Sequence, residues 1–201
     1  MDDEFCCGVA YEVVLTEGLR VGAELDEAAL DRLRSADERW RAKESALSLL
    51  AVRPRARREL AGRLERKGYA EPAVAWALAE ADRLGLLDDT AFAEAWVRDR
   101  LRLRPRGARA LQSELVRKGV APDVASDAVT RVMADAGARD GALCMAAAEK
   151  WMRSNGRRLQ HATDVEERRR VERRLSGFLM RRGFAPADIR DAIRTCVRSQ
   201  P

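Results

Sequence analysis

Three stretches of the chain share one arrangement of apolar, basic and glycine positions. Each has two leucines four residues apart and then, after one further residue, two basic residues, a glycine and a large apolar residue. The stretches are LAGRLERKGY (60–69), LQSELVRKGV (111–120) and LSGFLMRRGF (175–184). Leucines at this spacing line one face of an α-helix. The pattern therefore predicts three amphipathic helices that end in the same way.

The glycine of each stretch predicts how its helix ends. Gly68, Gly119 and Gly183 suit the first position beyond a helix, because glycine adopts the left-handed backbone conformation needed there. In such a Schellman ending the apolar residue after the glycine packs against the second leucine. The two basic residues fall in the last turn, where cations complement the helix dipole. Each stretch thus encodes a complete helix C-cap.

Further helices are predicted on both sides of each stretch. A proline follows each glycine by three or four residues, a place that suits the first turn of a new helix. Apolar residues at helical spacing also precede each stretch, as in Phe92, Trp96, Val97 and Leu101. The unit is therefore three helices, repeated three times, with glycine-to-glycine spacings of 51 and then 64 residues. The extra 13 residues fall around 154–170 and predict either a longer loop or a lengthened middle helix.

This repeat predicts an all-α fold of three tandem three-helix repeats that form an elongated, curved body. The predicted parts are an N-terminal extension over 1–38 and repeats over 39–88, 89–138 and 139–201. Composition agrees, because charged residues make up 35% of the chain and aromatic residues only 5%, which gives β-sheets little to build with. One compact helical bundle is the alternative.

Charge is segregated along the chain. Residues 1–38 contain 11 acidic and 3 basic side chains, whereas the whole chain has a net charge of +5, so the remainder carries +13. The basic residues concentrate in the predicted middle helices and the stretches that lead into them. An acidic head on a basic body indicates an anionic partner, either nucleic acid or an acidic protein surface.

Ten of these basic residues are the candidate partner contacts. They are Arg53, Arg55, Arg57, Lys67, Arg104, Arg106, Arg109, Lys118, Arg181 and Arg182. A stripe of such side chains suits a phosphate backbone or a carboxylate-rich surface. The alternative for each of them is a solvated helix face, with arginine favoured over lysine by codon usage.

Nothing in the sequence predicts catalysis, a metal or a cofactor. His161 is the only histidine, the four cysteines form no C-x-x-C pair, and no nucleotide-binding glycine loop or nucleophile motif occurs. Cys196 lies on an apolar helical stripe and is predicted to pack as a small hydrophobe. With no signal peptide and no long apolar run, we expect a cytoplasmic, monomeric binding protein without membrane contact.

Direct DNA binding is a second hypothesis. Two helices joined at a glycine are typical of a helix-turn-helix, whose second helix reads bases in the major groove. Here the second helix, over 72–84, is predicted to expose alanines, Trp76, Glu80 and Asp82, which suit base reading poorly. Electrostatic association through the basic middle helices, with single-stranded or double-stranded DNA, is the stronger form of this hypothesis.

Several segments resemble the RecX family of bacterial regulatory proteins. RPRARRELAGRLERKGY (53–69) and GLLDDTAFAEAWVRDR (85–100) carry the Arg-Pro-Arg opening, the Lys-Gly stop, and the Phe-Ala and Trp-Val pairs of the family's first repeats. RGARALQSELVRKGV (106–120) is similar to its second repeat, and GLRVGAELDEAAL (18–30) to the segment before the repeats in longer members. The resemblance covers about residues 18–200 and is strongest over 42–130.

The chain departs from the family pattern at a few places. Ala56 stands where the family often has serine, and Asp88 where asparagine is common. The third repeat carries the insertion around 154–170. The N-terminal strand region of longer members is shortened, with FCCGVAYEVVL (5–15) as a candidate remnant that could include a strand.

The resemblance implies tandem three-helix repeats and a function that periodicity does not show. RecX proteins bind the RecA recombinase and its filament on single-stranded DNA. They lie in the filament groove, and they inhibit the ATPase, strand-exchange and coprotease activities by blocking filament growth or promoting disassembly. The expected role is therefore negative modulation of RecA in DNA repair, recombination and the SOS response. Transcriptional regulation through direct DNA binding is the alternative.

Overall fold

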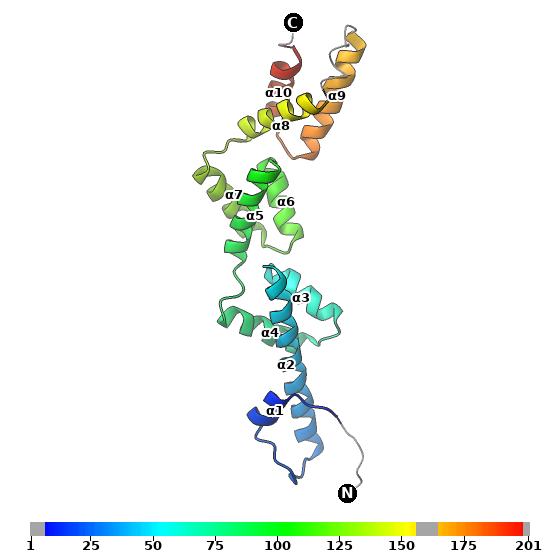
Figure 1. Ribbon diagram of the computed structural model, residues 1–201, viewed down its shortest axis with the longest axis vertical. Coiled ribbons are helices and arrows are strands. Elements are labelled where there is room, and N and C mark those ends of the chain that lie inside the picture. Colours follow the sequence, from blue (N-terminus) through cyan, green and yellow to red (C-terminus); the bar gives the residue numbers. More distant parts are fainter. Residues whose placement is uncertain (1–6, 156–164, 199–201) are drawn as a thin grey trace. The chain divides into compact units, whose positions relative to one another are not determined.

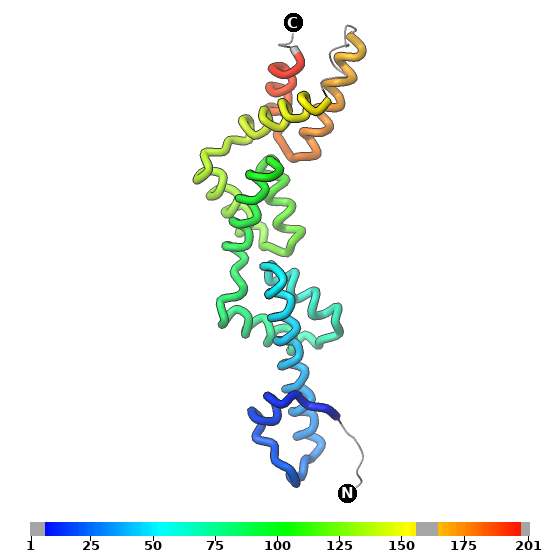
Figure 2. The backbone as a smooth tube through the Cα atoms, viewed as in Figure 1, coloured from blue at the N-terminus to red at the C-terminus, as the bar shows by residue number. Residues whose placement is uncertain are grey.

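The structure is a computed structural model that describes residues 7–155 and 165–198. These residues form ten α-helices and no strand (Figure 1), and the path of the chain is drawn in Figure 2. The all-α prediction is therefore confirmed. The chain divides into two compact units, Met1–Asp89 and Thr90–Pro201, each with its own core.

The first unit contains four helices. They are α1 (Tyr11–Thr16), α2 (Glu27–Val52), α3 (Arg57–Arg66) and α4 (Glu71–Arg83). Asp26 caps α2 by accepting a hydrogen bond of 2.7 Å from the Ala29 N–H. Leu60 and Leu64 of α3 are completely buried in a core whose α2 and α4 positions are mostly alanines. These small side chains let α2 and α4 pack closely, so the core consists of α3 leucines over two alanine-lined helices.

The N-terminal extension differs from its prediction in two ways. Residue 38, the expected boundary, lies inside the continuous helix α2. The candidate strand at 5–15 is wrong for the described residues, because Tyr11–Thr16 form helix α1. A helix satisfies its own backbone hydrogen bonds, whereas a lone strand here would need a pairing partner. The buried Asp37 ties this segment to α2 by accepting 2.7 Å bonds from the Ala10 N–H and from Arg41.

The second unit contains six helices. They are α5 (Asp89–Leu103), α6 (Ala108–Arg117), α7 (Pro122–Asp135), α8 (Asp140–Asn155), α9 (Val165–Arg181) and α10 (Pro186–Arg198). In α6, Leu111 and Leu115 are completely buried, and in α9 the corresponding Leu175 and Leu179 are too. The α9 leucines join a core cluster that α8 and α10 complete. The repeated leucine spacing thus identifies the buried face of each middle helix.

The three glycine stops adopt the predicted Schellman geometry. Gly68, Gly119 and Gly183 have φ angles of +91°, +95° and +77°. The Tyr69 N–H donates to the Leu64 carbonyl at 3.4 Å, and the corresponding bonds at the other two stops measure 3.1 and 3.4 Å. All three apolar residues after the glycines are at least partly buried. The C-cap prediction is confirmed at each site.

Part of the extra length of the third repeat lies in its middle helix. Helix α9 has 17 residues, against 10 in each of α3 and α6. The part of the predicted insertion at 156–164 lies outside the described residues. Cys196 packs at the edge of the third repeat's core, as predicted, while Cys144 is fully buried in it. Burial, followed by the charges of Asp188 and Asp140, raises the pKa of the Cys144 thiol to about 12, so it stays protonated.

Two aspartates cap middle helices in the same way. Asp89, at the start of α5, accepts a 2.8 Å hydrogen bond from the Arg57 N–H at the start of α3. Asp140, at the start of α8, accepts a 3.1 Å bond from the Ala108 N–H at the start of α6. Each carboxylate therefore caps the middle helix of the repeat before it. In both pairs the donor and the acceptor are 32 residues apart. Residues 51 positions apart in the first two repeats are therefore structurally equivalent within their own repeats.

The second and third repeats meet backbone to backbone. The buried Gly107 donates its N–H to the Arg182 carbonyl at 3.0 Å. A Cβ added at Gly107 would lie 2.7 Å from the carbonyl carbon of Gly183 and closer still to its oxygen. Only glycine leaves room for this approach. The contact places the end of α9 directly against the turn that opens α6.

Candidate partner-binding surface

The ten basic residues singled out from the sequence are all described, and they fall into two groups. Six already make hydrogen bonds, ion pairs or ring contacts, namely Arg53, Arg55, Arg57, Arg106, Lys118 and Arg182. Four have exposed side chains with no hydrogen bond or ion pair to another described residue, namely Lys67, Arg104, Arg109 and Arg181. The first group is held in place by the fold, and the second is open to a partner.

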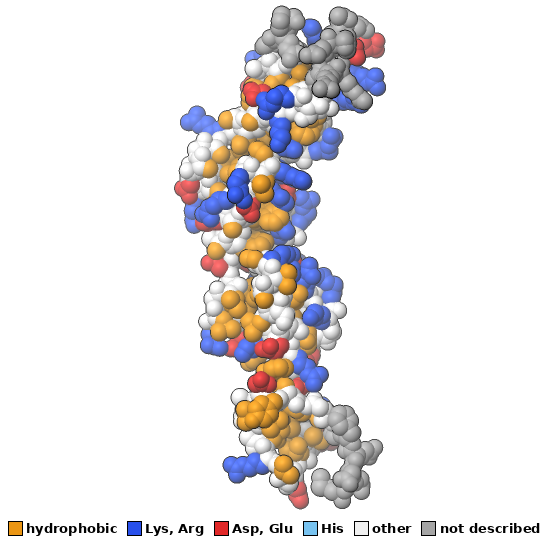
Figure 3. Space-filling view, viewed as in Figure 1, with side chains coloured by type: hydrophobic (Ala, Val, Ile, Leu, Met, Phe, Trp, Pro, Cys, Tyr) orange, Lys and Arg blue, Asp and Glu red, His pale blue; other side chains and the backbone are white. Residues whose placement is uncertain are grey.

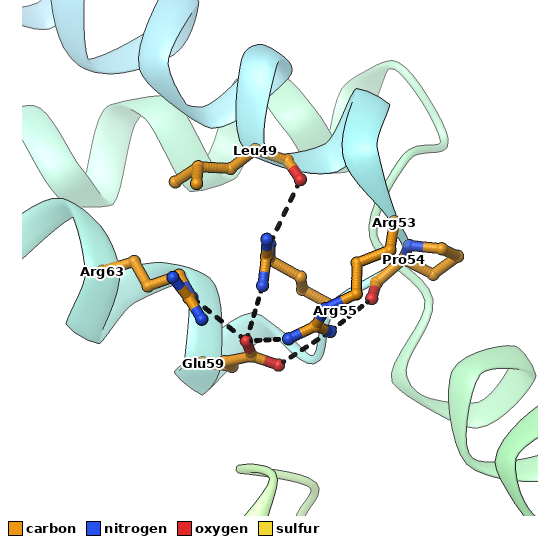
Figure 4. Close-up of polar contacts among 6 residues, drawn as sticks. All are labelled: Leu49, Arg53, Pro54, Arg55, Glu59 and Arg63. Atoms are coloured by element: carbon orange, nitrogen blue, oxygen red, sulfur yellow. Dashed lines mark hydrogen bonds and ion pairs between the residues drawn. The ribbon is translucent and has the colours of Figure 1, made fainter.

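In the first unit, one carboxylate gathers three arginines (Figure 4). Arg53 donates to both oxygens of Glu59, at 2.5 and 3.2 Å. Arg55 donates from Nη1 to Glu59 at 2.7 Å and from Nε to the Leu49 carbonyl at 3.1 Å. Arg63 adds a bond of 3.1 Å from one turn further along α3. The Arg-Pro-Arg element is thereby fixed to the start of the middle helix.

These contacts determine the charge state of Glu59 and the role of Arg55. Burial of the Glu59 carboxyl opposes ionisation, but hydrogen bonds from the three arginines outweigh it and hold its pKa at about 2. Arg55 is only 6% exposed and has an internal carboxylate as its partner. Arg55 is the only one of the ten candidate partner contacts that is buried, and a guanidinium buried in this way supports the fold.

Arg57 contributes to two contacts in the first unit. Its guanidinium pairs with Asp82 of α4, while its backbone N–H is the donor that Asp89 caps. Both partners of the ion pair are about half exposed, at 45% and 49%, so water screens their attraction. The Arg57 side chain remains accessible, with its charge partly balanced by Asp82.

In the second unit the counter-charge is Glu114, which is almost fully buried on α6. It accepts bonds from Arg106 at 2.6 Å, from Arg100 at 2.9 Å and from the Trp96 indole at 3.3 Å. The Arg100 guanidinium and the Lys118 ammonium lie 4.1 and 4.0 Å from the Trp96 ring centroid. Such cation–π contacts fix both cations over the indole. The result is a basic cluster organised around one aromatic ring and one carboxylate.

Arg182 brings a further positive charge to this part of the second unit. Its guanidinium lies 4.5 Å from the centroid of Phe178 and donates to the Pro105 carbonyl at 3.1 Å. Burial, and then the charges of Arg106 and Arg104, lower its pKa. The structure thus brings together residues 77 positions apart in the chain, which the repeat pattern alone does not reveal.

Exposed cations are numerous elsewhere on the middle helices. Figure 3 shows Lys and Arg side chains over α3 in the first unit and along α6 in the second. Helix α9 adds five exposed arginines, which are Arg168, Arg169, Arg170, Arg173 and Arg174. Sequence reasoning omitted these and Arg100, although the runs RRRVERR and RDRLRLRPRGAR contain them. It also missed Glu59 and Glu114 as the counter-charges that arrange the arginines.

The chemistry available on these surfaces is recognition of anions. Arginine forks suit carboxylate and phosphate oxygens, and preorganised arginines lose little conformational entropy on binding. In the described part of the chain, no group of three or more His, Cys, Asp or Glu side chains is arranged to hold a metal ion. None of the helices in these same residues is both long enough and apolar enough to cross a membrane.

Comparison with known proteins gives the family. Residues 42–80 match the model of the first three-helix domain of RecX, and residues 88–129 match that of its second three-helix domain. A regulatory protein RecX from Mycobacterium sp. (strain KMS) is 42% identical over 148 residues, which cover 73% of this chain and 76% of the relative. The regulatory protein RecX of Mycobacterium tuberculosis is 41% identical over 138 residues, covering 69% and 75%.

Solved structures agree on the fold. A crystal structure of regulatory protein RecX superposes with a TM-score of 0.72 at 22% identity and covers 100% of this chain and 92% of that one. RecX from Lactobacillus salivarius superposes with a TM-score of 0.63 at 22% identity, covering 79% and 96%. At this identity the superpositions establish the tandem three-helix architecture, and the mycobacterial relatives establish the family. The chain therefore belongs to the RecX family of regulatory proteins, which are regulators and not enzymes.

Proposed function

We propose that this chain is a negative modulator of the RecA recombinase. It binds RecA and the RecA filament on single-stranded DNA, and it inhibits the ATPase, strand-exchange and coprotease activities. Membership of the RecX family carries the proposal. The consequence for the cell is restraint of recombination, repair and the SOS response.

The arrangement of basic residues supports binding to a repeating partner. The first two repeats each open their middle helix with an Arg-Pro-Arg element, and exposed cations follow, such as Lys67 on the first and Arg109 on the second. A filament presents the same surface at regular intervals, so several repeats of one chain engage it together. Linked contacts of this kind gain affinity from effective concentration without any single strong contact.

The test is ATP hydrolysis by RecA on single-stranded DNA, titrated with the chain at about 50 mM and about 200 mM salt, a range over which phosphate-dominated binding weakens by orders of magnitude. We expect inhibition at fewer than one chain per recombinase and at both salt concentrations. The variant K67E/R109E should inhibit less well. The variant R153E/R190E makes the same change of net charge on two other exposed arginines and is the matched control. Wild-type chain that neither binds the filament nor slows hydrolysis refutes the proposal.

Direct DNA binding is the second candidate function, and helix α9 is the observation that favours it. The five exposed arginines named above for α9 lie within seven consecutive residues, 168–174. Such a cluster suits the sequence-independent electrostatic attraction of DNA phosphates. Anisotropy of a labelled oligonucleotide without RecA tests it: binding should weaken steeply with salt and drop in the variant R173E/R174E. Inhibition of RecA only at excess chain and only at low salt would favour this candidate over the first.

A further inference from the structure

The two Arg-Pro-Arg elements occupy corresponding positions and have different counter-charges. The first is Arg53-Pro54-Arg55 and the second, 51 residues later, is Arg104-Pro105-Arg106. Their equivalence is structural, because the middle helix after each is capped in the same way by an aspartate 32 residues further on. Differences between the two elements therefore reflect their side chains and not a shift in register.

In the first element a carboxylate completes the site. Glu59 accepts hydrogen bonds from both arginines, at 2.5 and 3.2 Å from Arg53 and at 2.7 Å from Arg55. Burial of Glu59 opposes its ionisation, but the hydrogen bonds from the arginines outweigh this effect and keep the carboxyl ionised. The first element thus shows which ligand this backbone and this pair of arginines accommodate: a carboxylate between two guanidinium groups.

In the second element the corresponding position is Ala110. The third repeat packs against it: a Cβ placed at Gly183 would lie 2.8 Å from the Ala110 N and closer to its Cβ. The third repeat therefore crowds the position that Glu59 holds in the first repeat. Arg106 turns instead to Glu114, at 2.6 Å. The Arg104 side chain is left exposed, with no hydrogen bond or ion pair to another described residue.

The third repeat also adds a cation next to Arg104. The Arg182 guanidinium donates to the carbonyl of Pro105, the residue that follows Arg104, and rests on the Phe178 ring. Burial, then the charges of Arg106 and Arg104, lower the pKa of Arg182. Like charges on neighbouring side chains repel each other, and an external anion bound between them relieves that repulsion. The ring and the carbonyl fix Arg182 in advance, so little entropy is lost on binding.

The geometry points to Arg104 and Arg182 as a binding site for a carboxylate side chain of the partner protein. An aspartate or glutamate of the partner accepts hydrogen bonds from these two arginines, as Glu59 does from the arginines of the first repeat. A carboxylate is favoured over a DNA phosphate because it is the group that the equivalent element binds in this same chain. The inference rests on the proposed function, in which the partner is a RecA filament.

Two measurements test the site. The first follows the side-chain Nε–H signals of Arg104 and Arg182 by NMR in the full chain, titrated with tetraglutamate and separately with inorganic phosphate. We expect tetraglutamate to shift both signals while that of the exposed Arg190 stays in place. The second compares R104E and R104E/R182E with R190E and R153E/R190E, respectively, in RecA filament inhibition. Each site variant should need about tenfold more chain than its charge-matched control for the same inhibition.

The outcomes separate this inference from the proposed function. Shifts no larger than that of Arg190 overturn the site, and so does a phosphate response at lower concentration than the tetraglutamate response. Equal inhibition by R104E and R190E also overturns the site, while the proposed function stands. Because the Arg104 side chain makes no polar contact with other described residues, R104E tests recognition without breaking the fold. If wild-type chain leaves RecA unaffected but tetraglutamate shifts both signals, the function fails and the site stands.

Discussion

Replacing Glu59 with glutamine should destabilise the first unit, because this carboxylate neutralises three arginines at once. The substitution keeps the size of the side chain and removes its charge. Arg53 and Arg63 have side chains that are each 41% exposed, so water can solvate them after the change. Arg55 is 6% exposed and would keep a buried charge with only the Leu49 carbonyl as a close acceptor. The cost therefore falls mainly on Arg55.

The magnitude follows from the pKa of Glu59. The ordinary value is 4.5 and the folded value is about 2. At about 1.36 kcal/mol for each pH unit, this difference corresponds to ~3.4 kcal/mol of folding stability at neutral pH. The Glu59 side chain is 17% exposed and glutamine can still accept a hydrogen bond, so we expect E59Q to lose about 2–3 kcal/mol.

The sign of the pH dependence is fixed by the lowered pKa. A carboxyl with a depressed folded pKa contributes stability that is complete above its unfolded pKa and is lost as pH falls toward its folded pKa. About 2 kcal/mol of the contribution should be gone by pH 3, within the window from 4.5 to about 2. Because the glutamine introduced in E59Q does not titrate, the difference in stability between wild type and E59Q should shrink over the same window.

The assay is urea unfolding followed by circular dichroism at pH 7 and pH 3, with E65Q as the matched control. Glu65 lies on the same helix, is exposed, and makes no side-chain ion pair with a described residue. We expect E65Q to stay within about 0.5 kcal/mol of wild type at both pH values. A loss in E59Q below that size at pH 7, or one that is unchanged at pH 3, would refute the reasoning.

Three further substitutions test the glycine positions by thermal unfolding. G119V forces a β-branched residue into a φ of +95° and should cost about 1–3 kcal/mol; an unchanged melting temperature would contradict the cap. G62A should instead stabilise by about 0.5–1 kcal/mol, because the new Cβ meets only the flexible end of Arg66, at 3.7 Å, and a lower melting temperature would count against this account. G107A places a Cβ against the backbone of Gly183 and should cost about 2 kcal/mol or more in the second unit; a neutral result would mean that the two repeats do not meet as described.

The helices and their ends were predictable from the sequence because their causes are local. A Schellman ending needs only a glycine and the few residues before it, so Gly68, Gly119 and Gly183 could be assigned without knowing what surrounds them. The buried leucines followed from helical spacing in the same way. The family's short motifs then supplied the identity of the repeats, which stereochemistry alone does not provide.

The N-terminal segment was mispredicted because its conformation depends on a distant partner. Val, Tyr and Cys residues favour a strand by propensity, but no strand is available among the described residues to pair with them. The segment forms helix α1 and is fixed by the buried Asp37, which accepts from the Ala10 N–H 27 residues away. A contact between positions so far apart leaves no local signature in the sequence.

The roles of the arginines were decided by tertiary structure. Arg53 and Arg104 hold corresponding positions, yet Arg53 is paired with Glu59 whereas the Arg104 side chain has no ion pair with a described residue. In the second repeat the position of Glu59 is taken by Ala110, against which the third repeat packs through Gly183. Charge and helical period are properties of the chain and can be read along it. Whether a cation pairs with a carboxylate of the same chain depends on the side chains packed beside it. Packing brings together residues that are far apart in the sequence.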